Sequence, residues 1–477
     1  MWQFVALGGT IDNDGKPPIG GSCYLMHNEK LGIVVDAGFY PQSQKAFAQK
    51  ENEKVGPTIQ YKMIGNRRLP IIPELRRLSD ADFVPEGSEY NLPNFSALKN
   101  LEEFVVIVTH GHGDHSGAVP RLKRMFPRAK IVMTRPTYEI SQWGWHDYLR
   151  IMRRRKQSPI YGRADLQELG RDIVVVSDTA ALNVGEAAIR LFPAGHILGA
   201  VSVLVRTPEV SVFFSGDISF QDQRTVGGAP ALDPSVTGDI DYLVSESTYG
   251  GKAAGKSREA AEREFVGILE SCLGLGGKAL LPALSIGRST EIVSILDCYG
   301  VTRKWPVWID GSARQLTDIY VGYDKLPPSV KENYIEYKSE RDDIIASPGP
   351  CVMIAPAGMM AGGWAQTYVM AWAGDEKNLI VLSCYQDRFT PGFRLLHTPR
   401  GGRMQLNGEN MTVNARVEQV SLSSHANGDE LVEMVQRMNP RRGTFLVHGE
   451  EAKMDAFRAA LPHGLTVKTF TNHAYDL

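Results

Sequence analysis

The stretch that decides the fold runs from Phe104 to Gly117 and reads FVVIVTHGHGDHSG. Its first five residues, Phe104 to Val108, are β-branched or bulky and predict a buried strand. Four polar residues follow within six positions: His110, His112, Asp114 and His115. The glycines between them allow the chain to bend tightly as it leaves the strand. A polar cluster at this position indicates a functional site built on the end of a sheet.

The residue types and spacing of this cluster are those of a metal site. His110 and His112 are two positions apart, so both imidazoles leave the end of a strand on the same side. Asp114 and His115 follow in a loop that can bend back toward the same point. Nitrogen and oxygen donors suit zinc or a similar divalent ion. One ion could take the two histidines and a second could take Asp114 and His115, whereas the alternative is a set of solvated loop histidines.

Length and composition describe an ordinary folded protein. The 477 residues allow two to four domains, and 43% of them are hydrophobic and 22% charged, which is close to the globular average. The 52 basic and 54 acidic residues give a net charge of -2, so no overall positive field indicates nucleic acid as a partner. Any basic surface must therefore be local.

The cysteines and the N-terminus predict a reducing compartment. Five cysteines are an odd number, and none forms a C-x-x-C pair, which argues against a disulfide framework and against a cysteine zinc site. The start MWQFVALGG has no basic segment before its apolar run, and no stretch approaches the roughly 18 apolar residues of a membrane span. We expect a cytoplasmic protein with no membrane segment.

The pattern along the chain changes near Glu246. Before it, short β-branched runs predict strands at 32–36, 104–108, 173–176, 210–214 and 241–244. After it, a helix at 257–273, a strand at 278–281 and a helix at 288–299 predict an α/β domain with a mainly parallel sheet, continuing to about residue 404. A strand is then expected from 411 to 422, and a helix from Asn427 with Glu430 completing a capping box.

Three further strand ends each carry one potential ligand beside a glycine: His196, Asp217 and His448. A lone histidine at such a position is more often a hydrogen-bonded structural residue. Together with the cluster at 110–115, however, these residues supply the additional donors that two metal ions need.

These motifs resemble those of the metallo-β-lactamase superfamily, whose fold is an αββα sandwich. HGHGDH at 110–115, His196, Asp217 and Val35-Asp36-Ala37-Gly38 carry the resemblance. SESTYG at 245–250, SSHA at 423–426 and VHGE at 447–450 are similar to three extra motifs of the β-CASP nucleases, in which a second α/β domain is inserted. The resemblance implies a lactamase-like domain at 1–243 and 405–477 around a β-CASP domain at 244–404.

The resemblance also implies the roles of individual residues. It places His110, His112 and His196 on one zinc ion, Asp114, His115 and His448 on the other, and Asp217 on both, with manganese as the alternative metal. Asp36 would orient a ligand or the attacking water. Catalysis would use Asp114 and Asp217 with Glu246 and His425, the last as the donor of a proton to the leaving oxygen.

The implied substrate is single-stranded RNA, because RNA-cleaving members carry a histidine where His448 stands and DNA-repair members carry valine. Phosphate could bind at Gly287, Arg288 and Ser289, where a strand turns into a helix. The basic run Arg153 to Lys156, preceded by Trp143, Trp145 and Tyr148, could clamp a single strand or be a solvated helix face. A DNA nuclease, a small-ester hydrolase and a catalytically silent RNA-binding scaffold are the alternatives.

The chain departs from the family pattern at several positions. Asn427 stands where aspartate is usual, Ala357 where serine is common, and Trp364 where arginine is common. The last two lie near the RNA groove of the family, which suggests a changed substrate length or cleavage mode. The segment 39–100, with its Arg67-Arg68 and Arg76-Arg77 pairs, is longer than expected and suggests a lid or protein-binding surface. A homodimer and other protein partners are left open.

Overall fold

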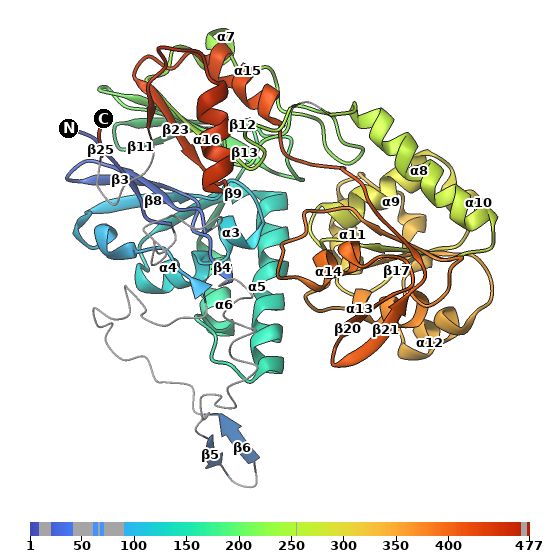
Figure 1. Ribbon diagram of the computed structural model, residues 1–477. Coiled ribbons are helices and arrows are strands. Elements are labelled where there is room, and N and C mark those ends of the chain that lie inside the picture. Colours follow the sequence, from blue (N-terminus) through green and yellow to red (C-terminus); the bar gives the residue numbers. More distant parts are fainter. Residues whose placement is uncertain (9–20, 42–60, 65–66, 71–89, 254, 469–474) are drawn as a thin grey trace.

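The computed structural model describes residues 1–8, 21–41, 61–64, 67–70, 90–253, 255–468 and 475–477 (Figure 1). Most of the segment 39–100, including Arg76 and Arg77, lies outside these residues. Among the described helices, none has the length and apolar character needed to cross a bilayer. None of the five cysteines forms a disulfide.

Two seven-stranded mixed sheets pack face to face. The first sheet has the order β10 (Ile173–Val176), β9 (Lys130–Thr134), β8 (Glu103–Ile107), β3 (Leu31–Val35), β2 (Tyr24–His27), β1 (Gln3–Ala6) and β25 (Tyr475–Asp476). The second has the order β11 (Ala181–Val184), β12 (Ala187–Pro193), β13 (Val201–Arg206), β14 (Ser211–Phe214), β15 (Tyr242–Glu246), β23 (Gly443–Val447) and β24 (Val467–Lys468). The predicted strand at 104–108 is thus confirmed as β8, a strand inside the first sheet.

The alternation of side chains along the strands builds the layers. Ile33 and Val105 face the second sheet and join the core between the sheets, whereas Val34 and Val106 face the opposite way and pack against helices. Helices α4 (Val119–Met125), α5 (Arg135–Arg155) and α6 (Arg163–Asp172) cover the first sheet, and α15 (Gly428–Met438) and α16 (Glu451–Ala460) cover the second. The result is the expected αββα sandwich.

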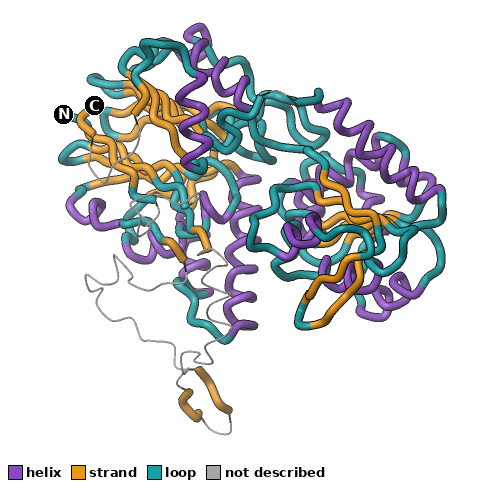
Figure 2. The backbone as a smooth tube through the Cα atoms, in the orientation of Figure 1, coloured by secondary structure: helices purple, strands orange, loops and turns teal. Residues whose placement is uncertain are grey.

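A third sheet is formed by residues that lie between β15 and β23 in the sequence. All five of its strands are parallel, in the order β17 (Val307–Ile309), β18 (Val352–Ala355), β16 (Ala279–Pro282), β19 (Leu379–Leu382) and β22 (Arg416–Gln419). Its helices and hairpin are α8 (Arg258–Gly274), α9 (Arg288–Cys298), α10 (Val301–Lys304), α11 (Ala313–Gly322), α12 (Lys338–Ala346), α13 (Ala365–Trp372), α14 (Pro391–His397), β20 (Gly402–Leu406) and β21 (Glu409–Val413). Figure 2 shows this unit beside the sandwich, with its own sheet and flanking helices.

Two sequence predictions need correction here. The continuous strand expected from 411 to 422 is wrong, because it is divided into β21, which forms a hairpin with β20, and β22, which pairs with β19. The expected domain boundary at residue 404 falls inside β20. Since β22 belongs to the third sheet, the sheet pairing favours a return to the sandwich after residue 419. The predicted helices at 257–273 and 288–299 are confirmed as α8 and α9.

Candidate metal centre

The predicted ligands gather at one edge of the sandwich because each follows the end of a strand. His110 and His112 follow β8, whereas Asp114 and His115 lie in the one-turn helix α3 (Gly113–Ser116) rather than in the expected loop. The others follow strands of the second sheet: His196 after β12, Asp217 after β14 and His448 after β23. They form two donor groups, each with ligand atoms within 4.8 Å of one another: His110, His112, His196 and Asp217, and Asp114, His115 and His448.

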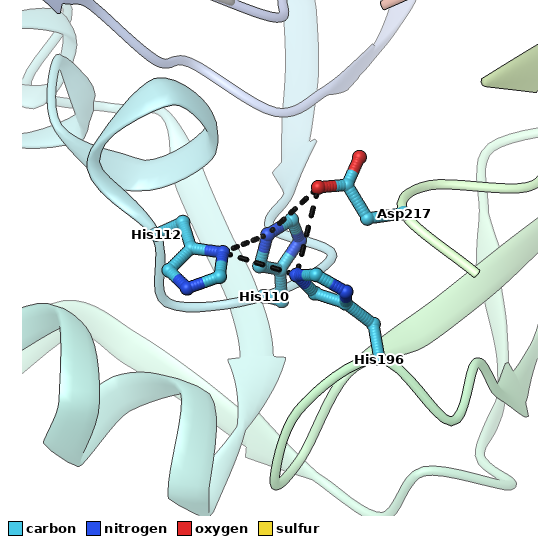
Figure 3. A group of neighbouring side chains, drawn as sticks. All are labelled: His110, His112, His196 and Asp217. Atoms are coloured by element: carbon cyan, nitrogen blue, oxygen red, sulfur yellow. Dashed lines mark hydrogen bonds and ion pairs between the residues drawn. The ribbon is translucent and has the colours of Figure 1, made fainter. Parts of the chain in front are cut away.

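Figure 3 shows the first group converging on one point. His112 Nδ1 lies 3.0 Å from His110 Nε2 and 3.1 Å from His196 Nε2. The Oδ2 atom of Asp217 completes the group, 3.5 Å from His110 Nε2 and 3.6 Å from His196 Nε2. Three nitrogens and one carboxylate oxygen therefore face a common centre, as in a zinc site.

The second oxygen of Asp217 faces the other group. Asp217 Oδ1 lies 3.3 Å from His115 Nε2 and 3.4 Å from His448 Nδ1. In the described part of the chain this buried atom has no hydrogen-bond partner. The His448 ring also approaches Asp114, with 3.3 Å between Nε2 and Oδ2. A carboxylate that turns one oxygen toward each donor group has the arrangement of a bridging ligand.

Hydrogen bonds outside the cluster determine which histidine nitrogens are available. His196 Nδ1 donates to the carbonyl oxygen of Ser424 over 2.8 Å, so its Nε2 keeps a lone pair. His115 Nδ1 donates to Asp36 Oδ2 over 2.7 Å. Burial lowers the pKa of His115, but Asp217 and Asp36 outweigh burial and raise this pKa well above its usual value, which favours the protonated ring in the absence of metal. Burial lowers the pKa of His196 well below its usual value, which favours the neutral ring. His196 thus has the neutral ring and the outer hydrogen bond of a metal-binding histidine, and His115 has the outer hydrogen bond.

Thr109 is a site residue that the sequence reading missed. Its N–H and Oγ1 donate to the two oxygens of Asp36 over 2.7 and 2.9 Å. Because this hydroxyl proton is used, Thr109 Oγ1 accepts from His110 Nδ1 over 3.1 Å. Its position directly before the first histidine was the available signal. The buried Asp36 therefore orients His115 directly and His110 through Thr109.

Glu246 and His425 form a pair beside the first donor group. His425 Nδ1 lies 3.1 Å from both carboxylate oxygens of Glu246. The carboxylate is buried and accepts the N–H of Ile218 over 2.7 Å. Burial alone would lower the pKa of His425, but Glu246, with Asp217 and Asp114 beyond it, raises this pKa to about 9. The imidazolium form is thus favoured at neutral pH.

Comparisons with known proteins agree with this geometry. Three family models match: the metallo-β-lactamase superfamily over residues 98–250, the β-CASP domain over 290–395, and a Zn-dependent metallo-hydrolase RNA specificity domain over 410–471. The probable RNase MJ4 of Methanocaldococcus jannaschii is 30% identical over 81% of this chain and 91% of its own length. The chain belongs to the β-CASP family of the metallo-β-lactamase superfamily.

Several other relatives of this β-CASP chain are longer than it is. It is 29% identical over 79% of its length to the cleavage and polyadenylation specificity factor subunit 3-II of Arabidopsis thaliana, and the match covers 64% of that protein. It is 31% identical over 76% of its length to the transcription termination factor FttA of Pyrococcus abyssi, covering 60% of that protein. A crystal structure of a protein of unknown function from Enterococcus faecalis V583 matches all of both chains with a TM-score of 0.58 and 16% identity, which shows the fold alone.

In this β-CASP protein the residues predicted to bind phosphate are engaged internally. The Arg288 guanidinium donates to the carbonyl oxygen of Leu422. The Ser289 hydroxyl is buried and donates to the carbonyl oxygen of Ser285 over 2.7 Å. Gly287, at φ 75°, approaches Ile197 so closely that an added Cβ would lie 2.7 Å from its Cγ2 atom. The backbone N–H groups of Arg288 and Ser289, on which the prediction rests, donate to the carbonyl oxygens of Ile286 and Leu284 over 2.9 and 3.0 Å, and phosphate binding at this turn stays a prediction.

Two of the three aromatic residues of the possible clamp beside the basic run, Trp145 and Tyr148, are not available for stacking. Trp145 and Tyr148 are buried on the inner face of α5. The Trp145 indole donates to the carbonyl oxygen of Ser116 over 2.9 Å, and the Tyr148 hydroxyl accepts the N–H of Ile160 over 2.8 Å. These rings hold α5 against its neighbours and cannot stack on a nucleic acid. Helical spacing alone did not show which face was buried.

An ion network that the sequence reading missed connects the inserted unit to the site. Arg258 on α8 donates to the carbonyl oxygen of Ser423 over 2.9 Å, beside the segment that carries His425. The same guanidinium is held by Glu262 at 3.0 Å and by Glu291. Both glutamates are 1% exposed. Arg258 thereby attaches the His425 segment to two helices of the inserted unit.

The same two glutamates also hold a loop of the sandwich. Arg224 donates to Glu262 over 2.8 and 2.6 Å, and Thr225 donates its N–H and hydroxyl to Glu291 over 3.0 and 2.7 Å. Three segments far apart in sequence meet at this network, so no local pattern could have predicted it.

Proposed function

We propose that this protein is a metal-dependent ribonuclease that hydrolyses phosphodiester bonds of single-stranded RNA and binds two zinc ions. The observation that carries the proposal is the orientation of Asp217, whose two oxygens face two separate donor groups. The chain is a β-CASP metallo-hydrolase with relatives named for RNA processing. The number and identity of the metal ions and the preference for RNA as substrate are what we propose.

The donor set fits two divalent ions in the predicted partition. His110, His112 and His196 would hold one ion, Asp114, His115 and His448 the other, and Asp217 both. Bound zinc would lower the pKa of a water molecule and offset the charge that develops on the phosphate. Asp36 would keep the His115 ring in the orientation that its 2.7 Å hydrogen bond defines.

His425 is the proposed general acid. Its Nδ1–H is held by Glu246, which leaves the proton on Nε2 for the leaving oxygen of the RNA. The Glu246 carboxylate stabilises the charged imidazolium and fixes its direction. His448 supports RNA over DNA through the family resemblance, and the match of residues 410–471 to an RNA specificity domain supports the same choice.

The test compares cleavage of a 5′-labelled single-stranded RNA and the matching DNA by the wild type and by Asp114→Ala. Asp342→Ala, an exposed aspartate on α12, is the matched control. We expect RNA cleavage by the wild type and the control, a loss of at least about 100-fold in Asp114→Ala, and about two zinc ions per wild-type chain by elemental analysis. The product ladder distinguishes internal cuts from trimming at an end.

Other outcomes would select the alternatives. Equal cleavage of DNA would favour a nuclease without preference for RNA. Bound zinc without cleavage of either strand would favour another hydrolase of the superfamily. RNA binding without bound metal would favour a silent scaffold, and full activity of Asp114→Ala would contradict the proposed site.

A further inference from the structure

Trp364 is exposed at the edge of the inserted sheet. It lies at the start of α13, in the loop that follows β18, and 41% of its surface is accessible. Tyr337 and Tyr385 of the same unit are also exposed, at 64% and 54%, whereas Tyr320, Tyr368 and Trp372 are buried. Single exposed aromatic side chains are common on protein surfaces, so the exposure of an indole indicates a function only if other residues hold the ring in one orientation.

A buried ion pair holds one face of this indole. The Arg341 guanidinium lies 3.5 Å from the centre of the Trp364 ring. Arg341 is 7% exposed, and its Nε and Nη2 donate to the two oxygens of Asp310 over 2.6 and 2.9 Å. The Tyr368 hydroxyl donates to the same carboxylate over 2.8 Å. Burying such an ion pair costs solvation free energy. The buried pair holds the Arg341 guanidinium in a fixed position under the exposed ring.

Gly311 leaves space for the Trp364 ring because it has no side chain. A Cβ added to Gly311 would lie 2.8 Å from Trp364 Cδ1, and Gly311 has φ 67°, which also favours glycine. Within the described residues, Arg341 is the one cation that stacks on the Trp364 ring, and no second aromatic ring stacks on it. The indole is therefore preorganised with one face covered by Arg341.

The edge that carries Trp364 adjoins the candidate metal centre. All five strands of the sheet are parallel, so their following loops lie at one edge, where ligands bind in open α/β sheets. The loop before Trp364 packs against the loops that follow β16 and β19. A Cβ on Gly358 would lie 2.8 Å from both Leu284 N and Cys384 Sγ. Beyond Cys384, the Tyr385 hydroxyl donates to Glu450 over 3.3 Å, two positions after His448.

We propose that Trp364 is a subsite that stacks an unpaired base of the RNA, with Arg341 as its positioning residue. This inference rests on the proposed function. Aromatic side chains bind single-stranded nucleic acid by stacking on successive bases, and a ring already fixed by a guanidinium loses little freedom on binding. The subsite takes any base, because every base offers a flat face.

The test measures binding of a single-stranded RNA in the Asp114→Ala background, which removes cleavage. Trp364→Leu is expected to weaken Kd by about 5- to 100-fold, and Trp364→Phe to retain most of the affinity. Trp305→Leu is the matched control, because Trp305 also carries a cation over its ring, Lys304 at 5.6 Å, but precedes β17 at the opposite end of the sheet. Its expected effect is within about twofold.

A second measurement changes the RNA as well as the protein. RNAs with one abasic position, moved stepwise along the strand, are bound to the Asp114→Ala protein, and one position should lose about as much affinity as Trp364→Leu does. Trp364→Leu should abolish the penalty at that position. Equal penalties in both proteins, or no effect of Trp364→Leu, would overturn the subsite. Absence of RNA binding by the Asp114→Ala protein itself would instead count against the proposed function.

Discussion

Gly38 lies where two backbone segments of the site meet. Its N–H donates to the carbonyl of Ser22, whose own N–H donates to the carbonyl of Asp114. A Cβ at Gly38 would lie 1.7 Å from that Asp114 oxygen, whereas a Cβ at Gly113, in the same turn, would meet nothing within 4 Å. The absence of a side chain at Gly38 thus allows the ligand turn to pack closely against the loop that carries Asp36.

We predict that Gly38→Ala displaces Asp114 and His115 and lowers bound zinc toward one ion per chain. The clash is with backbone, so relaxation must move the turn, and we expect RNA cleavage to fall by at least about 100-fold. Gly113→Ala should keep both metals and activity. Elemental analysis and cleavage rates of the two variants check this, and normal zinc content in Gly38→Ala would contradict it.

His425 allows a test of proton donation at a single atom. We predict that His425→Ala lowers kcat on RNA by about 10²- to 10⁴-fold, because the leaving oxygen then lacks its acid. A p-nitrophenyl phosphodiester needs no proton on its leaving group, so its hydrolysis should fall much less. Exposed His463 supplies the control variant His463→Ala. Equal losses on both substrates would point to a structural role of His425, as would loss of bound zinc.

At the scale of elements, Asp241 joins the starts of two strands of the second sheet. Its Oδ2 accepts the N–H and hydroxyl of Ser211, both over 2.9 Å, and its Oδ1 lies 3.1 Å from Arg441 and 3.4 Å from Arg442. Burial raises the pKa of Asp241, but the Ser211 hydrogen bonds and the two arginines outweigh it and lower the pKa below its ordinary value. The ionised carboxylate therefore favours the folded state.

The sign of the pH dependence follows from this shift. Because the pKa is lower in the folded state, the stabilisation is present above about pH 4 and is lost as pH falls through the folded pKa. We predict that Asp241→Asn lowers the free energy of unfolding by about 1–2 kcal/mol at pH 7 and flattens its decline below pH 4. Urea unfolding between pH 7 and pH 3 measures both effects. The exposed Asp178→Asn should change neither, and an unchanged acid slope in Asp241→Asn would refute the assignment.

The predicted 411–422 strand is divided between two elements, β21 and β22. Its sequence, MTVNARVEQVSL, alternates apolar and polar residues with little interruption. The break occurs at Asn414 and Ala415, whose N–H groups both donate to the carbonyl of Ala373. A residue 41 positions before Asn414 therefore ends one strand and starts the next, which periodicity cannot report.

At the scale of the whole molecule, the network around Arg258 couples the inserted unit to the site. We predict that Arg258→Gln lowers the free energy of unfolding by about 3–5 kcal/mol, since it leaves the buried Glu291 without its ion-pair partner, whereas Glu262 keeps its ion pair with Arg224. RNA cleavage should also fall while zinc content is kept, because the Ser423 contact lies beside His425. Denaturant unfolding, cleavage rates and elemental analysis measure the three effects.

Arg263 provides the control on the same helix. Its ion pair with Glu259 is exposed, so Arg263→Gln should leave both the free energy of unfolding and RNA cleavage nearly unchanged. If Arg258→Gln behaved like Arg263→Gln, the network would not couple the two units.

The family, the αββα architecture and the candidate metal ligands could all be predicted from the order of residues along the chain. These features are local, because a buried strand, the glycine after it and a polar residue at its end stand together in the chain, as they do from Phe104 to His115. The tertiary structure decided which histidine nitrogens face inward, how Asp217 divides its oxygens, that Ser289 and Trp145 are buried, and how Arg341 supports Trp364. Each depends on atoms that come from distant segments, such as Asp36 with His115 or Asp310 with Arg341, and only folding brings these within hydrogen-bonding distance.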